Sequence, residues 1–202
     1  MNATMKNFIL GLPFARALWT KLKADPGPAP HIVKQQAISE LARAHGAKIF
    51  VETGTYRGDM VAAMTPNFAQ LYSIELSPEL HRAAARRFEG HPAVEILFGD
   101  SGQIMGALMP RLKDKAVFWL DGHFSGGETA QAALDTPIWA ELEHILAAPD
   151  LGHVILIDDA RLFGRDPAYP TVAAISDFVT GLRPNVRIDV ANDSIRILPT
   201  SA

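Results

Sequence analysis

Acidic side chains stand directly after two apolar runs in the second half of this chain. Asp121 follows residues 116–120, and the pair Asp158 and Asp159 follows residues 153–157. Carboxylates that converge without a partner repel one another, and the repulsion raises their pKa values. A hard divalent cation removes that cost, and an all-oxygen ligand set with room for water and substrate suits Mg²⁺. We therefore take Asp121, Asp158 and Asp159 as candidate metal ligands.

A structural interpretation of the same acids stays open. Asp158 can cap a loop, and Asp159 can pair with Arg161 or with another base. We favour the metal, because ligands of open α/β sheets bind beyond the carboxyl ends of the strands, which is where these acids are expected.

A glycine-containing segment after an earlier apolar run is a second candidate site. Its sequence from Glu52 to Gly58 is Glu-Thr-Gly-Thr-Tyr-Arg-Gly, and its glycines allow a tight turn and a close backbone approach to a ligand. A dinucleotide fingerprint would have a further glycine at position 56, where this chain has Tyr56. Glu52, two residues before Gly54, favours a ligand that carries a positive ammonium group and no pyrophosphate. The alternative is an ordinary glycine turn.

Polar residues also follow the next two apolar runs. Glu75 stands 21 residues after Gly54, where an acid commonly accepts hydrogen bonds from a ribose diol. Asp100 and Ser101 follow the third run and are candidates to contact an adenine edge. The alternatives are a solvated acid before the helix cap at Ser77, and helix capping by Ser101.

The apolar pattern predicts the elements that position these residues. Near-continuous apolar runs, typical of strands buried on both faces, alternate with helical patterns. These runs are residues 49–51, 71–74, 94–98, 116–120 and 153–157. Two alternating segments at 186–190 and 194–198, joined by a tight turn at 191–193, predict an antiparallel hairpin. We expect a Rossmann-like, doubly wound α/β fold with a mainly parallel seven-stranded sheet and a C-terminal antiparallel hairpin at one edge.

Short signals predict where several helices begin and end. Ser77, Pro78 and Glu79 form a strong helix start, and that helix is expected to run to Gly90. Ile38, Leu41 and Ala42 share one face of an earlier helix, and Ile138, Leu142 and Ile145 share one face of a later helix.

The composition narrows the remaining functions. The 202 residues include no cysteine, which excludes disulfides, Cys-ligated zinc, iron–sulfur clusters and thiol nucleophiles. A net charge of −3 argues against a dedicated nucleic-acid binder. A hydrophobic content of 48% is too high for disorder. We expect residues 1–30 to form an N-terminal helix and a Pro/Gly linker, and residues 31–202 to form one cofactor domain.

The apolar stretch at residues 5–22 has two interpretations. We favour an amphipathic helix that docks on its own domain or on a partner subunit, an arrangement compatible with a homodimer. The other interpretation is a weak interfacial contact with a membrane. The chain has no apolar run of the about 18–20 residues needed to span a bilayer and no convincing signal-cleavage site, so we expect a cytoplasmic protein.

Together, the segment from Glu52 to Gly58, Glu75, Asp121 and the pair at 158–159 resemble class I S-adenosylmethionine (SAM)-dependent methyltransferases. More narrowly, they resemble the metal-dependent O-methyltransferases of the catechol, caffeoyl-CoA and macrolide-sugar types. The resemblance covers about residues 47–200. Its more specific part is an Asp after the fourth strand combined with an acidic pair after the fifth, followed by an apolar-apolar-Gly sequence at 162–164.

The resemblance implies a methyltransferase that acts on a hydroxyl of a small molecule or sugar with Mg²⁺ assistance. The methionine part of SAM would lie against Glu52 and the loop of Gly54, Thr55, Tyr56 and Gly58. Glu75 would hold the ribose hydroxyls, and Asp100 and Ser101 would lie near the adenine. Asp121 would serve both cofactor and metal, and Asp158 and Asp159 would complete the metal site.

The base that accepts the hydroxyl proton departs from the family pattern. The catechol enzymes place a lysine three residues after the fourth-strand Asp, and this chain has Phe124 there. His123 is the nearest proton acceptor, and its unperturbed pKa of about 6.5 suits that role. A structural role for His123 as a donor to the following loop is equally open. That loop, residues 125–129, has the glycines of a mobile lid.

Two other functions remain open. One is a nicotinamide-dependent oxidoreductase on a related sheet, against which the absence of the middle glycine counts. The other is a non-catalytic binding module that keeps the SAM fold or acts as a partner subunit. The retained acids argue mildly against that second alternative.

Overall fold

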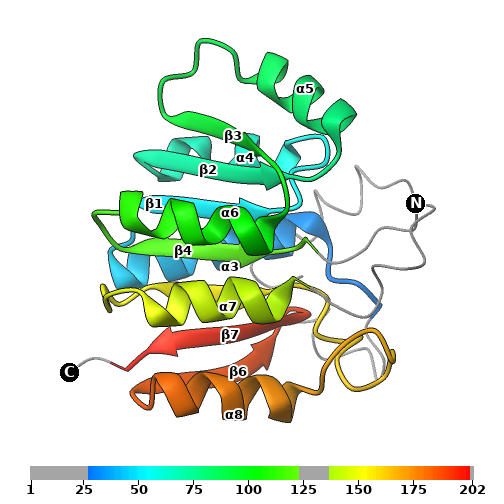
Figure 1. Ribbon diagram of the computed structural model, residues 1–202, viewed down its shortest axis with the longest axis vertical. Helices are drawn as coiled ribbons and strands as arrows, with labels where there is room; N and C mark the ends of the chain where they lie inside the picture. Colours follow the sequence, from blue (N-terminus) through cyan, green and yellow to red (C-terminus); the bar gives the residue numbers. More distant parts are fainter. Residues whose placement is uncertain (1–26, 123–136, 201–202) are drawn as a thin grey trace.

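A computed structural model describes residues 27–122 and 137–200, and in this part of the chain seven strands form one sheet (Figure 1). The strand order is β3-β2-β1-β4-β5-β7-β6. The bounds are β1 Ile49–Thr53, β2 Gln70–Glu75, β3 Val94–Phe98, β4 Ala116–Leu120, β5 Val154–Ile157, β6 Val186–Ala191 and β7 Ser194–Pro199. Strands β1 to β5 pair in parallel, and β7 pairs antiparallel with both β5 and β6. The predicted fold class is confirmed, including the hairpin at one edge.

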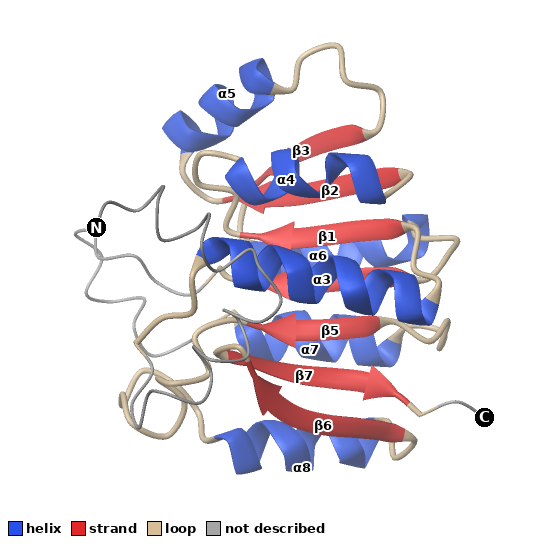
Figure 2. Ribbon diagram, turned by 180° about the vertical axis from the view of Figure 1, so that it is seen from behind, coloured by secondary structure: helices blue, strands red, loops and turns tan. Residues whose placement is uncertain are grey.

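Helices cover both faces of the sheet. On one face lie α3 His31–His45 and α4 Asp59–Met64 (Figure 2). On the other face lie α6 Ser101–Leu108, α7 Ile138–Ala147 and α8 Val172–Leu182 (Figure 1). Helix α5, Pro78–Arg87, contacts β2 and β3 near the edge of the sheet. Two short 3-10 turns, η1 Thr65–Asn67 and η2 Met109–Arg111, follow α4 and α6.

The two layers of helices enclose two hydrophobic clusters, one on each face of the sheet. Phe118, Leu142 and Ile175 belong to one cluster and are fully buried. Ile38, Phe50 and Trp119 belong to the other and are also buried. Every residue of β1, β4 and β5 is buried, because helices cover both faces of these central strands. This double burial explains their near-continuous apolar sequences.

The predicted helix signals are confirmed in part. Ser77 caps α5, and its hydroxyl accepts a hydrogen bond from the Leu80 N–H at 3.4 Å. The helix ends at Arg87 rather than at Gly90, which has a φ of 77° beyond the end of the helix. Asp100, not Ser101, caps α6, because its carboxylate accepts a hydrogen bond from the Gln103 N–H at 3.1 Å.

Several predicted features lie outside the described residues. They are the N-terminal helix at residues 5–22, His123 and the loop at residues 125–129. Within residues 27–122 and 137–200, no helix combines the length and the apolar character needed to cross a membrane.

Candidate functional site

The carboxyl ends of four neighbouring strands bring the predicted site residues to one edge of the sheet. Strand β1 pairs with β2 on one side and with β4 on the other, so the topological switch point lies at β1. Thr53 is in register with Ile74 and Leu120, and Leu120 is in register with Ile157. The residues that follow these strands are therefore neighbours, as the sequence predicts.

The glycines of the loop after β1 are required by the protein itself. Gly54 has a φ of 84°, and a Cβ atom on it would lie 2.7 Å from the backbone oxygen of Asp121. Gly58 has a φ of 75°, and a Cβ atom there would lie 2.7 Å from the ring of Phe88. Tyr56 also has a positive φ, 49°, although it is not glycine. Position 56 therefore has a left-handed backbone, but the side chain of Tyr56 occupies the space that a glycine would leave for a pyrophosphate.

Glu75 is held by the backbone on both sides. One carboxylate oxygen accepts a hydrogen bond from the Tyr56 N–H at 2.8 Å, and the other accepts one from the Ser77 N–H at 2.8 Å. A carboxylate has about four lone-pair sites, so it can accept further hydrogen bonds from ligand hydroxyls. The two backbone contacts fix the orientation in which Glu75 would do so.

Glu52 lies in β1, just before the glycine loop, and is almost fully buried. The Ser73 hydroxyl donates to its carboxylate at 2.5 Å, and the Ser73 and Thr55 hydroxyl oxygens are 2.6 Å apart. Burial raises the pKa of Glu52 well above its ordinary value, and the negative charges of Asp121 and Glu75 raise it further. A cationic ligand beside this carboxyl would oppose that shift and favour the carboxylate.

The residue Glu141, on α7, is a further buried acid that the sequence reasoning missed. Its Oε1 accepts a hydrogen bond from Ser101 at 2.5 Å, and Thr53 also hydrogen-bonds to its side chain. Its Oε2 has no hydrogen-bond partner among the described residues. Burial raises the pKa of Glu141 to about 7. Ser101 thus joins the start of α6 to α7.

The acids after β4 and β5 interact with one another and with a buried lysine. Burial raises the pKa of Asp121 to about 8, with a further contribution from the negative charge of Asp158, whereas Lys34 acts in the opposite direction. Asp158 is buried, and the Lys34 ammonium donates to its Oδ2 at 2.5 Å. Its Oδ1 accepts a hydrogen bond from the Asp159 N–H at 2.7 Å.

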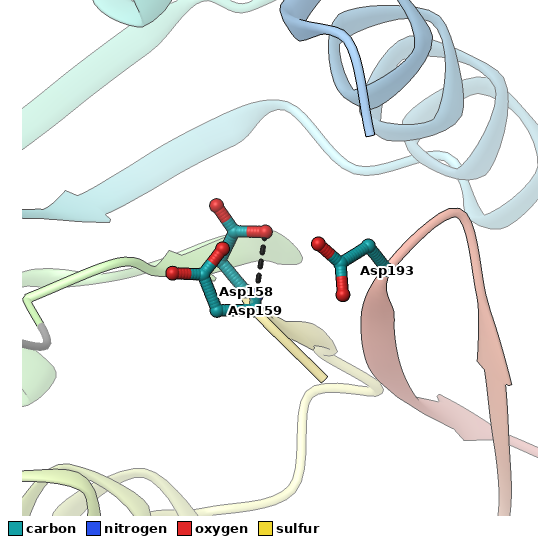
Figure 3. A group of neighbouring side chains, drawn as sticks. All are labelled: Asp158, Asp159 and Asp193. Carbon is teal, nitrogen blue, oxygen red and sulfur yellow. Dashed lines mark hydrogen bonds between the residues drawn. The ribbon is translucent and has the colours of Figure 1, made fainter. Parts of the chain in front are cut away.

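A second cation, Arg161, pairs with the next acids. Its guanidinium donates to Asp159 Oδ1 at 2.7 Å and also to Asp193. Asp193 lies in the hairpin turn between β6 and β7 and points toward the acids at the end of β5 (Figure 3). Ligand atoms of Asp158, Asp159 and Asp193 lie within 4.8 Å of one another. The pairing of Asp159 with Arg161 is the structural alternative that the sequence left open.

The cluster differs in membership from the predicted metal site. Asp193 takes the place of Asp121 in the group of three closely spaced carboxylates, and no sequence signal marks Asp193 beyond its place in a turn. Lys34 and Glu141 did have a sequence signal of burial, namely their helical spacing to apolar residues. Lys34 stands four residues before Ile38, and Glu141 stands three residues after Ile138 and four before Ile145. Charged residues at apolar helical positions are buried, and buried charges require partners.

An open pocket borders the cluster on the side of Arg161. It encloses about 390 Å³. Its walls are Gly27, Arg161, Leu162, Arg165, Asp166 and Pro167. The loop after β5 and the start of the described chain therefore meet beside the acids.

Among the comparisons with known proteins, only the search of solved structures finds matches. A scan against protein-family models finds no match, and a search of curated proteins finds none either. Among solved structures, the chain is similar to the O-methyltransferase TomG of Streptomyces achromogenes, solved with SAM, at 20% identity and a TM-score of 0.61 over 100% of this chain and 91% of that one.

Two further solved structures are similar over nearly their whole length. The methyltransferase PaMTH1 of Podospora anserina, bound to S-adenosylhomocysteine (SAH), has 15% identity and a TM-score of 0.58, covering 100% of this chain and 89% of that one. An O-methyltransferase of Bacillus cereus with SAH has 16% identity and a TM-score of 0.58, covering 97% and 90%. At these identities the likeness establishes a shared fold, the Rossmann-like α/β fold described above.

Proposed function

We propose that the protein is a SAM-dependent methyltransferase that acts on a hydroxyl group of a small molecule or sugar. The observation that carries the proposal is the set of acids around the Gly54 loop at the switch point of the sheet. Glu52, Glu75 and Asp121 interact electrostatically there. Such a cradle suits a ligand that combines positive charge with a ribose, and SAM has a sulfonium, an ammonium and a ribose diol.

In this proposal each acid has a separate task. Glu52 and the loop from Gly54 to Gly58 bind the methionine part of SAM. Glu75, whose carboxylate is oriented by two backbone N–H groups, accepts hydrogen bonds from the ribose hydroxyls. Asp100 and Ser101 lie at the start of α6 and are proposed to contact the adenine edge.

The reaction is an in-line displacement at the methyl carbon. A lone pair on the acceptor oxygen forms the new C–O bond while the C–S bond breaks, and SAH leaves with the electron pair on sulfur. The protein must align oxygen with carbon and exclude water. The hydroxyl proton goes to a general base, for which His123 is our candidate. The similar O-methyltransferases support an oxygen acceptor.

The predicted Mg²⁺ does not fit the acids as they are arranged here. Both oxygens of Asp158 are already bonded, one to Lys34 and one to the Asp159 N–H. Both oxygens of Asp193 accept hydrogen bonds from Arg161. A divalent ion at these carboxylates would lie against the Lys34 ammonium and the Arg161 guanidinium, which repel it, so no step of the proposed reaction is assigned to a metal.

Calorimetry tests the cofactor directly. We expect SAM and SAH to bind, and NADH to bind at least about tenfold more weakly because Tyr56 closes the position of the middle glycine. Glu75→Gln should weaken SAH binding by roughly tenfold, whereas Glu79→Gln, on the exposed face of α5, should leave it unchanged. SAH binding that is absent, or that is equal in both variants, would contradict the proposal.

The methyl acceptor is then identified by measuring SAM consumption with different compounds. The full-length protein is incubated with SAM and a panel of phenols, sugars and glycans, each with and without Mg²⁺. SAM turnover with an amine or thiol but with no hydroxylated compound would contradict the oxygen acceptor while leaving methyl transfer intact.

A further inference from the structure

We infer that Lys34 is a built-in countercation that takes the place of a divalent ion at the ends of β4 and β5, acting with Arg161. Lys34 is therefore a positioning residue for the acids of the site. The inference rests on the proposed function only for its activity measurement, the SAM turnover. Its ion-binding consequences can be tested whether or not the protein transfers methyl groups.

Lys34 is buried, and its ammonium is held in an ion pair with Asp158. Its side chain is 8% exposed, although lysine is almost never fully buried unless it is paired. Its ammonium lies 2.5 Å from Asp158 Oδ2 and 3.7 Å from Asp159 Oδ1, and its third neighbour is the Trp119 ring, 5.7 Å away. Lys34, on α3, thus contacts Asp158 at the end of β5, although the two residues are 124 positions apart in the sequence.

Arg161 supplies the second positive charge from the opposite side. It bridges Asp159 and Asp193, and its backbone N–H also donates to Asp193 at 2.9 Å. Asp159 therefore lies between the two cations, because it contacts both Lys34 and Arg161.

A divalent ion at the same carboxylates would be excluded for two reasons. It would compete with the Lys34 ammonium and the Arg161 guanidinium for the negative charge of the acids, and it would lie next to an ammonium that it repels. Removing one partner of a buried ion pair leaves an uncompensated charge. A variant without the Lys34 ammonium should therefore acquire affinity for a cation, provided that space for the ion is also left.

Terbium luminescence can detect such an ion, because a Tb³⁺ ion at the place of the ammonium would lie close enough to Trp119 to be sensitised by it. We expect the Tb³⁺ luminescence of the wild-type protein to equal that of Asp159→Asn, because neither protein should bind the ion at these acids. In Lys34→Ala, which opens space, we expect Tb³⁺ to bind at least tenfold more tightly and to be displaced by Mg²⁺. Lys34→Met, which removes the charge but fills the space, should not bind it. Lys34→Ala combined with Asp158→Asn should lose the new signal.

Activity gives a readout that a purely structural role would not change. SAM turnover by the wild-type protein should be insensitive to EDTA. Turnover by Lys34→Ala should fall and should be restored at least in part by millimolar Mg²⁺, whereas a variant that had only lost stability would not respond to the ion.

Two results would overturn the inference. One is that the wild-type protein binds Mg²⁺ or Tb³⁺ and that Asp159→Asn loses this binding. This measurement does not need Lys34→Ala, so it remains informative if that variant fails to fold. The other is a folded Lys34→Ala that gains no cation affinity. Failure of the proposed function would appear separately, as absence of SAH binding by the wild-type protein.

Discussion

The backbone of Gly54 packs directly against the backbone carbonyl of Asp121, so that a Cβ atom on Gly54 would lie 2.7 Å from that oxygen. The contact joins the start of the loop after β1 to the end of β4. The glycine that sequence reasoning assigns to ligand approach is thus required first by the neighbouring strand.

Gly54→Ala should therefore destabilise the protein by more than backbone strain alone. A left-handed φ costs a non-glycine residue about 1–2 kcal/mol, and a steric clash in a packed region adds about 1–3 kcal/mol. Gly90→Ala is a matched control, because Gly90 has a similar φ of 77° and nothing within 4 Å of the added atom. Urea unfolding of both variants measures the difference. Equal losses would show that the contact with Asp121 relaxes at little cost.

Glu52→Gln should separate folding from ligand binding. The raised pKa of Glu52 means that burial favours its neutral form, which a glutamine mimics while its amide oxygen still accepts from Ser73. We expect the unfolding free energy to change by less than about 1 kcal/mol, because no buried polar group loses its partner. SAH affinity should fall by roughly tenfold or more, since the amide cannot become an anion beside a ligand cation.

The matched control for Glu52→Gln is Glu89→Gln, at an exposed position after α5. It should change neither the unfolding curve nor the calorimetric affinity for SAH. Loss of folding in Glu52→Gln would mean that the carboxylate, rather than the neutral acid, is the form that stabilises the ligand-free protein.

Glu141 should make stability decrease as pH rises. Its pKa in the folded protein is about 7, above the ordinary value of 4.5, so the native state binds more protons than the unfolded state between these values. The contribution is fully present below pH 4.5 and is lost as pH rises to about 7. At 1.36 kcal/mol per pKa unit, the loss is about 3 kcal/mol.

Glu141→Gln should remove this dependence. Relative to the wild type, the variant should become more stable by up to about 3 kcal/mol between pH 5 and pH 8. Denaturant unfolding at both pH values gives the comparison. Glu143→Gln, at an exposed position two residues along the same helix, is the control and should follow the wild type. Parallel pH profiles for wild type and Glu141→Gln would disprove the prediction.

His153 should have the opposite effect at acid pH. Burial lowers its pKa from 6.5 to about 4, and its Nδ1 accepts a hydrogen bond from the Ala116 N–H at 3.0 Å. The contribution of His153 to stability is fully present above pH 6.5 and is lost as pH falls toward 4, by about 3 kcal/mol. His153→Asn, which can keep the acceptor, should flatten the unfolding profile in this window. An unchanged acid slope would show that other groups cause it.

The sequence predicted the frame of the site because local patterns encode it. Continuous apolar runs at 49–51 and 116–120 predicted strands buried on both faces, and the structure extends the first of them to Thr53. Parallel strands place their carboxyl ends at one edge. The approach of Glu75, Asp121 and Asp158 to a common edge therefore followed from their place after the strands.

What the acids are paired with could not be read in the same way. Lys34 and Asp158 are separated by 124 residues, and their contact depends on how α3 packs across β4 and β5. Asp193 reaches Arg161 only because the terminal hairpin joins the sheet beside β5. The helical spacing around Lys34 and Glu141 could have indicated that both are buried, but our sequence analysis missed them, and the spacing does not identify their partners.

The sequence by itself thus determined which segments form the strands, the edge at which the acids gather and the absence of thiol chemistry, whereas the order of the strands in the sheet came from the structure. Only the tertiary structure decided that two cations of the chain neutralise these acids. The physical reason is that strand formation depends on neighbouring residues, whereas the partner of a buried charge depends on which distant elements pack within a few ångströms of it.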